Sequence, residues 1–129
     1  MPLDDQPQAI THPGPLVAVV DDDAAVCDSM RVLLEAYDLN VCTYQNAGDF
    51  LTEDPKIACL IVDYQMPGLN GLELVSELRR RGNTVRTIMI TATTDPALEK
   101  RAGALGIQSV LRKPLANRVL LAALQSAIG

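Results

Sequence analysis

The sequence is short of the residues that define several large protein classes. It contains only three cysteines among 129 residues, Cys27, Cys42 and Cys59, and they are widely separated within apolar runs. This spacing indicates neither a disulfide framework nor a zinc knuckle, and it favours buried, reduced thiols. Basic residues are also few, since 11 lysines and arginines face 16 aspartates and glutamates, for a formal net charge of -5. That balance argues against the basic surface by which most nucleic-acid binders neutralise phosphates.

Long apolar runs and a recognisable leader are absent as well. No run is long enough to span a bilayer, and the first residues, Met-Pro-Leu-Asp-Asp, lack the basic and apolar segments of a secretory signal. We therefore expect a cytoplasmic location and no membrane partner. Half of the eight prolines fall within residues 1–15 among polar neighbours, which predicts a flexible N-terminal extension. The only histidine, His12, lies in it, and we expect its side chain to be solvated rather than catalytic.

The rest of the chain, residues 16–129, is long enough for one folded domain, and its apolar pattern alternates between strand and helix. Short apolar runs predict strands at residues 16–20, 41–44, 58–62, 87–91 and 107–111. Helical spacing follows each run: Val26, Met30, Leu33, Leu34 and Tyr37; Phe50 and Leu51; Leu72, Val75 and Leu78; a helix from Asp95-Pro96 to about Gly106; and Val119, Leu120, Ala123, Leu124 and Ile128. Five successive βα units predict an α/β fold, a doubly wound parallel sheet with helices on both faces.

Several charged residues are explained by helix ends. Arg79, Arg80 and Arg81 precede Gly82, and cations in a last turn followed by glycine are typical of a helix C-terminus, which we favour over an anion site. Asp95 before Pro96 is typical of a helix N-terminus. Asp23 is also more consistent with capping the first helix than with binding a metal.

Polar side chains follow four of the five predicted strands. Asp21 and Asp22 follow the first, Asp63 the third and Lys113 the fifth, and Thr91 ends the fourth. In doubly wound sheets ligands bind beyond the carboxyl ends of the strands, so we expect these side chains on one edge. Each of them alone has an ordinary structural explanation, but their joint placement at successive strand ends does not.

This set of residue types predicts phosphoryl chemistry. Crowded carboxylates are costly unless a cation lies among them, and their hard oxygen ligands suit Mg²⁺. The hydroxyl of Thr91 and the ammonium of Lys113 would complete a pocket for a tetrahedral anion. We therefore predict transfer of a phosphoryl group onto a carboxylate. Asp63 is the predicted nucleophile, because it projects from the central strand between the acidic pair and the Thr91 side.

Four fragments carry a family resemblance: Val-Val-Asp-Asp-Asp, Ile-Val-Asp-Tyr-Gln-Met-Pro-Gly-Leu-Asn-Gly, Ile-Thr-Ala and Leu-Arg-Lys-Pro. In this order they resemble the receiver domain of two-component response regulators, over residues 16–128. The resemblance implies a flavodoxin-like sheet with strand order 2-1-3-4-5 and a phosphoprotein switch in phosphorelay signal transduction. It implies a sensor histidine kinase or a histidine phosphotransfer protein as phosphodonor, and a downstream protein partner rather than direct contact with nucleic acid.

The resemblance also assigns roles at the site. Asp63 matches the phosphoacceptor, assisted by Thr91 and Lys113. The implied Mg²⁺ ligands are Asp21, Asp22, Asp63 and the backbone carbonyl of Gln65, with Asp22 binding directly and Asp21 mainly through water. Tyr64, Gln65 and Thr93 are expected to tune hydrolysis of the acyl phosphate, and Lys113-Pro114 is expected to be a cis peptide.

One position departs from the family pattern. Val110 stands three residues before Lys113, where the family usually has tyrosine or phenylalanine, so the usual aromatic rotamer switch is absent. We predict that phosphorylation shifts Thr91 and its loop, with a muted or differently routed change on the surface of the fourth helix, fifth strand and fifth helix. The sequence leaves open whether the domain forms a homodimer and whether it is a single-domain regulator or the receiver of a longer one.

Other function classes are weaker. A phosphorylation-independent scaffold is disfavoured by the intact acidic pair, acceptor, threonine and lysine, although Val110 leaves room for it. An aspartyl phosphatase or phosphotransferase needs an aspartate two residues after the nucleophile, and Gln65 there cannot serve as acid or base. A nucleotide-binding module lacks its glycine-rich phosphate loop. We therefore expect a signalling domain rather than an enzyme.

Overall fold

The computed structural model describes residues 14–93 and 95–129. Strands and helices alternate in the described chain. The strands are β1 (Leu16–Val20), β2 (Asn40–Tyr44), β3 (Cys59–Asp63), β4 (Arg86–Thr91) and β5 (Ser109–Arg112). The helices are α1 (Ala24–Glu35), α2 (Ala47–Glu53), α3 (Gly71–Arg80), α4 (Pro96–Ala104) and α5 (Asn117–Ile128). Across the described ranges, none of these helices is both long and apolar enough to cross a bilayer.

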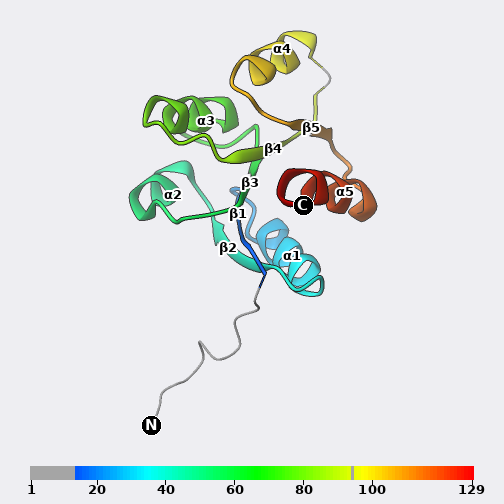
Figure 1. The fold of residues 1–129 in the computed structure, drawn as a ribbon. Coiled ribbons are helices and arrows are strands. Elements are labelled where there is room, and N and C mark those ends of the chain that lie inside the picture. The colour runs from blue at the N-terminus through cyan, green and yellow to red at the C-terminus, as the bar shows by residue number, and fades with distance from the viewer. Residues whose placement is uncertain (1–13, 94) are drawn as a thin grey trace.

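The five strands form one parallel sheet in the order β2-β1-β3-β4-β5, which confirms the predicted topology. In Figure 1, α1 and α5 cover one face of the sheet, and α2, α3 and α4 lie on the other. The chain leaves β1 toward β2 and later returns on the other side of β1 to form β3. The strand order therefore reverses between β1 and β3, the place where sheets of this kind bind ligands.

The hydrophobic core consists of two layers, one on each face of the sheet. Successive side chains of a strand point to opposite faces, so Leu60 packs with α2 and α3 residues while its neighbour Ile61 packs with residues of α1 and α5. All five residues of β3 are buried. This burial fixes the central strand from both sides, and with it the position of Asp63 at its end.

Helix ends follow the predicted chemistry. The side chain of Asp23 accepts hydrogen bonds from the backbone N–H groups of Ala25 at 2.9 Å and Val26 at 3.4 Å, and Asp95 caps α4. Arg80 and Arg81 pair with Glu77 at 2.5 and 2.7 Å. Arg79 and Arg80 lie in the last turn of α3 and Gly82 has a φ of 82°, which confirms that these residues form a helix C-terminus.

Arg79 binds different partners from Arg80 and Arg81. Its side chain donates to the carbonyl oxygens of Leu105 at 2.7 Å and Asn83 at 3.1 Å. Leu105 is the C-cap residue of α4, and Asn83 belongs to the turn after α3. Arg79 thus links the end of α4 to the turn that follows α3.

The predicted limits of three elements differ from those in the structure. Tyr37 does not extend the apolar face of the first helix, because α1 ends at Glu35 and Tyr37 is 59% exposed. The fifth strand begins at Ser109 rather than Ile107, and the fourth helix ends at Ala104 rather than near Gly106. Here Gly106 has φ of 76°, and the N–H of Ile107 bonds to the Ala102 carbonyl at 3.0 Å. Ile107 is therefore used to close the helix end.

The remaining predictions concern the thiols and the first residues. All three cysteines are free, as expected; Cys27 and Cys59 are buried, whereas Cys42 is only half-buried. The predicted extension at residues 1–15, including His12, falls outside the described residues apart from Gly14 and Pro15. Their carbonyl oxygens accept hydrogen bonds from the side chain and backbone of Asn40, at 2.6 and 3.1 Å.

Candidate functional site

The loop after β1 carries the first two acidic residues. The backbone N–H of Asp21 donates to the Tyr44 carbonyl oxygen at 3.0 Å, which extends the β1–β2 pairing by one residue. Asp21 is only 3% exposed, and its carboxylate accepts a hydrogen bond from the backbone N–H of Asp23 at 2.9 Å. Asp22, in contrast, is exposed. The loop therefore presents one buried and one exposed carboxylate side by side.

Asp63 is the last residue of β3 and is 5% exposed. One carboxylate oxygen, Oδ1, accepts from the backbone N–H of Gln65 at 3.3 Å. The other, Oδ2, accepts from the Lys113 ammonium at 3.1 Å, across 50 positions of sequence. The Lys113 side chain is 40% exposed. The fold thus brings a lysine from beyond β5 to an aspartate at the end of β3.

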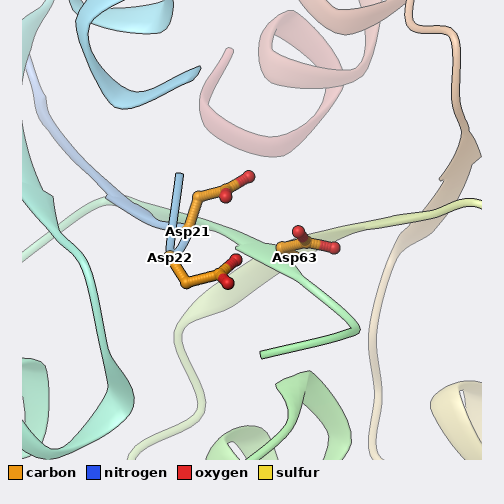
Figure 2. A group of neighbouring side chains, drawn as sticks. All are labelled: Asp21, Asp22 and Asp63. Carbon is orange, nitrogen blue, oxygen red and sulfur yellow. The ribbon is translucent and has the colours of Figure 1, made fainter. Parts of the chain in front are cut away.

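The three carboxylates converge, as Figure 2 shows for Asp21, Asp22 and Asp63. One carboxylate oxygen from each lies within 4.8 Å of the others. Asp21 and Asp22 come from the end of β1, and Asp63 comes from the neighbouring strand, so the cluster lies where the strand order reverses. A divalent cation with a preference for oxygen ligands, such as Mg²⁺, suits this donor set.

The charges at this cluster do not balance. Among the described residues, three carboxylates converge here, and the ammonium group of Lys113 pairs with one of them, that of Asp63. The pKa of Asp21 is raised from 3.8 to about 6: burial is the main cause, the carboxylates of Asp63 and Asp22 add to the rise, and the hydrogen bond from Asp23 and the charge of Lys113 oppose it. The folded protein therefore holds this carboxyl group in an environment that disfavours its charged form, and a bound cation would relieve that cost.

The other predicted site residues lie at the same edge. Thr91 ends β4, the neighbour of β3, and is 1% exposed. Its hydroxyl oxygen accepts from the backbone N–H of Thr93 at 3.1 Å, and its carbonyl oxygen accepts from the backbone N–H of Lys113 at 2.8 Å. The Lys113-Pro114 peptide is cis, as expected. The side chain of Gln65 is exposed, so only its backbone reaches Asp63.

Two residues that support the cluster were not given a role by the sequence. A Cβ atom added at Gly71 would lie 2.7 Å from the Asp63 carbonyl oxygen, and the Gly71 N–H bonds to the Tyr64 carbonyl at 2.8 Å. Its place in the Met-Pro-x-x-x-Gly fragment was a signal that could have found it. Cys27 donates its thiol to the Asp21 carbonyl oxygen at 3.3 Å, a contact between positions six apart that no sequence pattern indicates.

Comparison with known proteins agrees with the geometry. The family model described as "Response regulator receiver domain" matches residues 17–125. The chain is 36% identical over 115 residues to the transcriptional regulatory protein FixJ of Azorhizobium caulinodans, covering 88% of this chain and 54% of that protein. It is also 36% identical over 114 residues to the transcriptional regulatory protein TdiR of Thauera aromatica, covering 87% and 50%. The chain thus spans about half the length of these curated relatives.

Solved structures give the same result. A response regulator receiver protein from Burkholderia phymatum is 35% identical, with a TM-score of 0.77 over 89% of this chain and 95% of that one. A receiver domain protein described as CheY-like, from Methanospirillum hungatei JF-1, reaches a TM-score of 0.83 over 89% and 94% of the two chains. At 24% identity this second likeness concerns the fold alone.

Proposed function

Since this chain belongs to the receiver domain family of two-component response regulators, we propose that Asp63 accepts a phosphoryl group in a Mg²⁺-dependent reaction. The convergence of Asp21, Asp22 and Asp63 within 4.8 Å carries this proposal, together with the contact between Lys113 and Asp63. It joins a nucleophile, a place for a divalent cation and a fixed positive charge at one strand edge.

The reaction is an exchange of one bond to phosphorus for another. A carboxylate oxygen of Asp63 attacks the phosphorus of a phosphohistidine, a P–O bond forms, and the P–N bond to the donor imidazole breaks with its electrons left on nitrogen. The product is an acyl phosphate. Lys113, 3.1 Å from Asp63 Oδ2, offsets negative charge on the transferred group. The Thr91 hydroxyl oxygen accepts from the Thr93 N–H, which leaves its own proton to donate to a phosphoryl oxygen.

The chain's own oxygen atoms would hold the cation. Asp22 is exposed toward solvent and would bind Mg²⁺ directly, Asp21 would act mainly through water, and Asp63 and the Gln65 carbonyl would complete the protein ligands. When bound, Mg²⁺ supplies positive charge that draws phosphoryl oxygens toward Asp63. The raised pKa of Asp21 supports this assignment, because a buried carboxyl group with acidic neighbours gains most from a cation.

The proposed reaction needs a protein that donates the phosphoryl group and a partner that responds to it. A sensor histidine kinase or histidine phosphotransfer protein is the phosphodonor that we propose, in a cytoplasmic pathway with a downstream protein partner. The reaction on the domain's side is its own phosphorylation and dephosphorylation rather than turnover of a separate substrate. A phosphorylation-independent scaffold is the alternative, and the ion pair between Lys113 and Asp63 favours the phosphoacceptor over it.

The test is phosphorylation by acetyl phosphate, with and without Mg²⁺, read by intact mass. We expect the wild-type chain to gain one phosphoryl group only with Mg²⁺ and Asp63→Asn to gain none. Asp28→Asn removes an exposed carboxylate on α1 outside the cluster and should behave as wild type.

Two other outcomes would contradict the proposal. A gain that persists in Asp63→Asn would place the acceptor elsewhere. If neither acetyl phosphate nor an active cognate kinase phosphorylates the wild-type chain, the scaffold becomes the better description.

A further inference from the structure

The thiol of Cys27 lies directly behind the acidic loop. Cys27 is in the first turns of α1 and is 3% exposed. Its Sγ atom is 3.3 Å from the carbonyl oxygen of Asp21 and 3.9 Å from that of Tyr44. The second oxygen also accepts the backbone N–H of Asp21 at 3.0 Å. One buried thiol therefore joins α1 to the ends of β1 and β2, where the acidic loop starts.

The three carboxylates of the cluster are not held in the same way. Asp21 is fixed by the Asp23 N–H, and Asp63 by Gln65 and Lys113. Within residues 14–93 and 95–129, the exposed Asp22 carboxylate shows no hydrogen bond or ion pair of its own. Its direction therefore depends on the backbone that carries it.

The Asp21 carbonyl oxygen belongs to the peptide group that joins Asp21 to Asp22. A peptide group is planar, so holding this oxygen also holds the orientation from which the Cα of Asp22 continues. The Cys27 thiol is the side-chain donor to this oxygen. The orientation of the Asp22 side chain is thus linked to a contact on the buried side of the loop.

We propose that Cys27 is a positioning residue of the acidic site. Its thiol holds the peptide plane that directs the Asp22 carboxylate toward Asp21 and Asp63. The inference rests on the proposed Mg²⁺ site. It gives a role at that site to a residue that would otherwise contribute only to core packing. Cys27 touches neither the cation nor the phosphoryl group, so its loss should weaken cation binding without removing the reaction.

Cys59 provides a matched control for packing. It is another free thiol, fully buried in β3, and within the described residues its Sγ donates only to the carbonyl oxygen of its neighbour Leu60, at 3.8 Å. Replacing either cysteine by alanine removes the same atom from the core. Only the change at Cys27 also removes a donor from the acidic loop.

The experiment compares Cys27→Ala, Cys27→Val, Cys27→Ser and Cys59→Ala. Isothermal titration of the unphosphorylated protein gives the Kd for Mg²⁺, and acetyl phosphate labelling gives the KM for Mg²⁺ and the maximal rate. Because a thiol is a weak donor, we expect alanine and valine at Cys27 to raise Kd and KM by about 3- to 10-fold. The maximal rate at saturating Mg²⁺ should stay within about two-fold, as expected for a group that only orients a ligand.

The control variants separate positioning from packing. Cys27→Ser keeps a donor and should restore the wild-type Kd, and Cys59→Ala should leave it unchanged. The valine variant fills the volume without a donor, so its comparison with serine decides the question even if Cys27→Ala does not fold. Wild-type Mg²⁺ affinity in the valine variant, or an equal loss in Cys59→Ala, would overturn the inference. If the wild-type chain itself binds no Mg²⁺, the proposed function fails instead.

Discussion

Asp21 is a buried ionisable residue whose charged form destabilises the folded protein. Its carboxyl group is nearly inaccessible to solvent and lies beside Asp22 and Asp63. Burial raises its pKa from 3.8 to about 6, so the folded protein binds this proton more tightly than the unfolded chain does. The stabilising contribution is complete below pH 3.8 and is lost as the pH rises through about 6. At neutral pH the metal-free site is therefore a source of instability.

We predict that Asp21→Asn stabilises the metal-free protein at pH 7 by about 2 kcal/mol. The substitution removes the ionisable group, and a rise of about two units in its pKa on folding corresponds to slightly more than this free energy. The asparagine oxygen can still accept from the Asp23 N–H. Urea unfolding in EDTA at pH 4 and pH 7 measures the effect, which should vanish at the lower pH. The prediction is wrong if the variant is no more stable than Asp28→Asn at pH 7.

At the scale of single residues, the sequence predicted the groups that act through their side chains. Asp21, Asp63 and Lys113 were identified from residue type and from their places after strands, and the structure brings them together. Cys27 and Gly71 were missed as contributors because their contributions depend on contacts with backbone oxygens. Such contacts arise only when the loop and the helix are placed in space.

The turn from β3 into α3 is the element that holds Asp63, the proposed acceptor. The Tyr64 N–H bonds to the Ile90 carbonyl and its own carbonyl oxygen accepts from Gly71, both at 2.8 Å. Gly71 therefore packs directly on the backbone of Asp63 and Tyr64. An added Cβ would lie 2.7 Å from the Asp63 carbonyl oxygen and 3.0 Å from the Tyr64 Cα, and these backbone atoms cannot give way as the tip of a side chain could.

We predict that Gly71→Ala lowers the free energy of unfolding by about 1 to 3 kcal/mol, because the turn must shift. It should also slow labelling by acetyl phosphate, since Asp63 moves with the turn. Gly103→Ala is the matched control: it lies within α4 and its new Cβ meets nothing within 4 Å. That change should stabilise the protein by about 0.5 to 1 kcal/mol through helix propensity. Equal effects of the two substitutions would contradict the prediction.

The limits of the elements show where sequence patterns stop being sufficient. The apolar pattern predicts that a strand starts at Ile107. In the structure its N–H bonds to the Ala102 carbonyl and closes the end of α4, and its side chain packs in the core. Tyr37 has helical spacing, yet the chain turns at Asp38, whose φ is 64°. In both cases the apolar pattern continues past a helix end that is set by backbone hydrogen bonds.

For the molecule as a whole, the question is how a change at Asp63 reaches a surface. Val110 in β5 is half-buried and packs against the core layer that contains Leu98 and Ala102 of α4. A β-branched side chain in this position has few rotamers and cannot swing between core and solvent as a large ring could. The connections that the structure offers instead are two hydrogen bonds to Thr91, from the Lys113 N–H to its carbonyl oxygen and from the Thr93 N–H to its hydroxyl oxygen.

We therefore predict that phosphorylation changes the environment of Thr91, Thr93 and Lys113 strongly and that the change declines along α4 and α5. Amide chemical shifts with and without beryllofluoride, a stable mimic of the phosphoryl group, measure this decline. Val110→Tyr returns a ring to β5 and should enlarge the shifts on α4, whereas Val119→Ala on the exposed side of α5 should not. Wild-type shifts on α4 as large as those at Thr91 would mean that the signal crosses the domain without the ring. In that case the packing of Val110, and not only the backbone, transmits it.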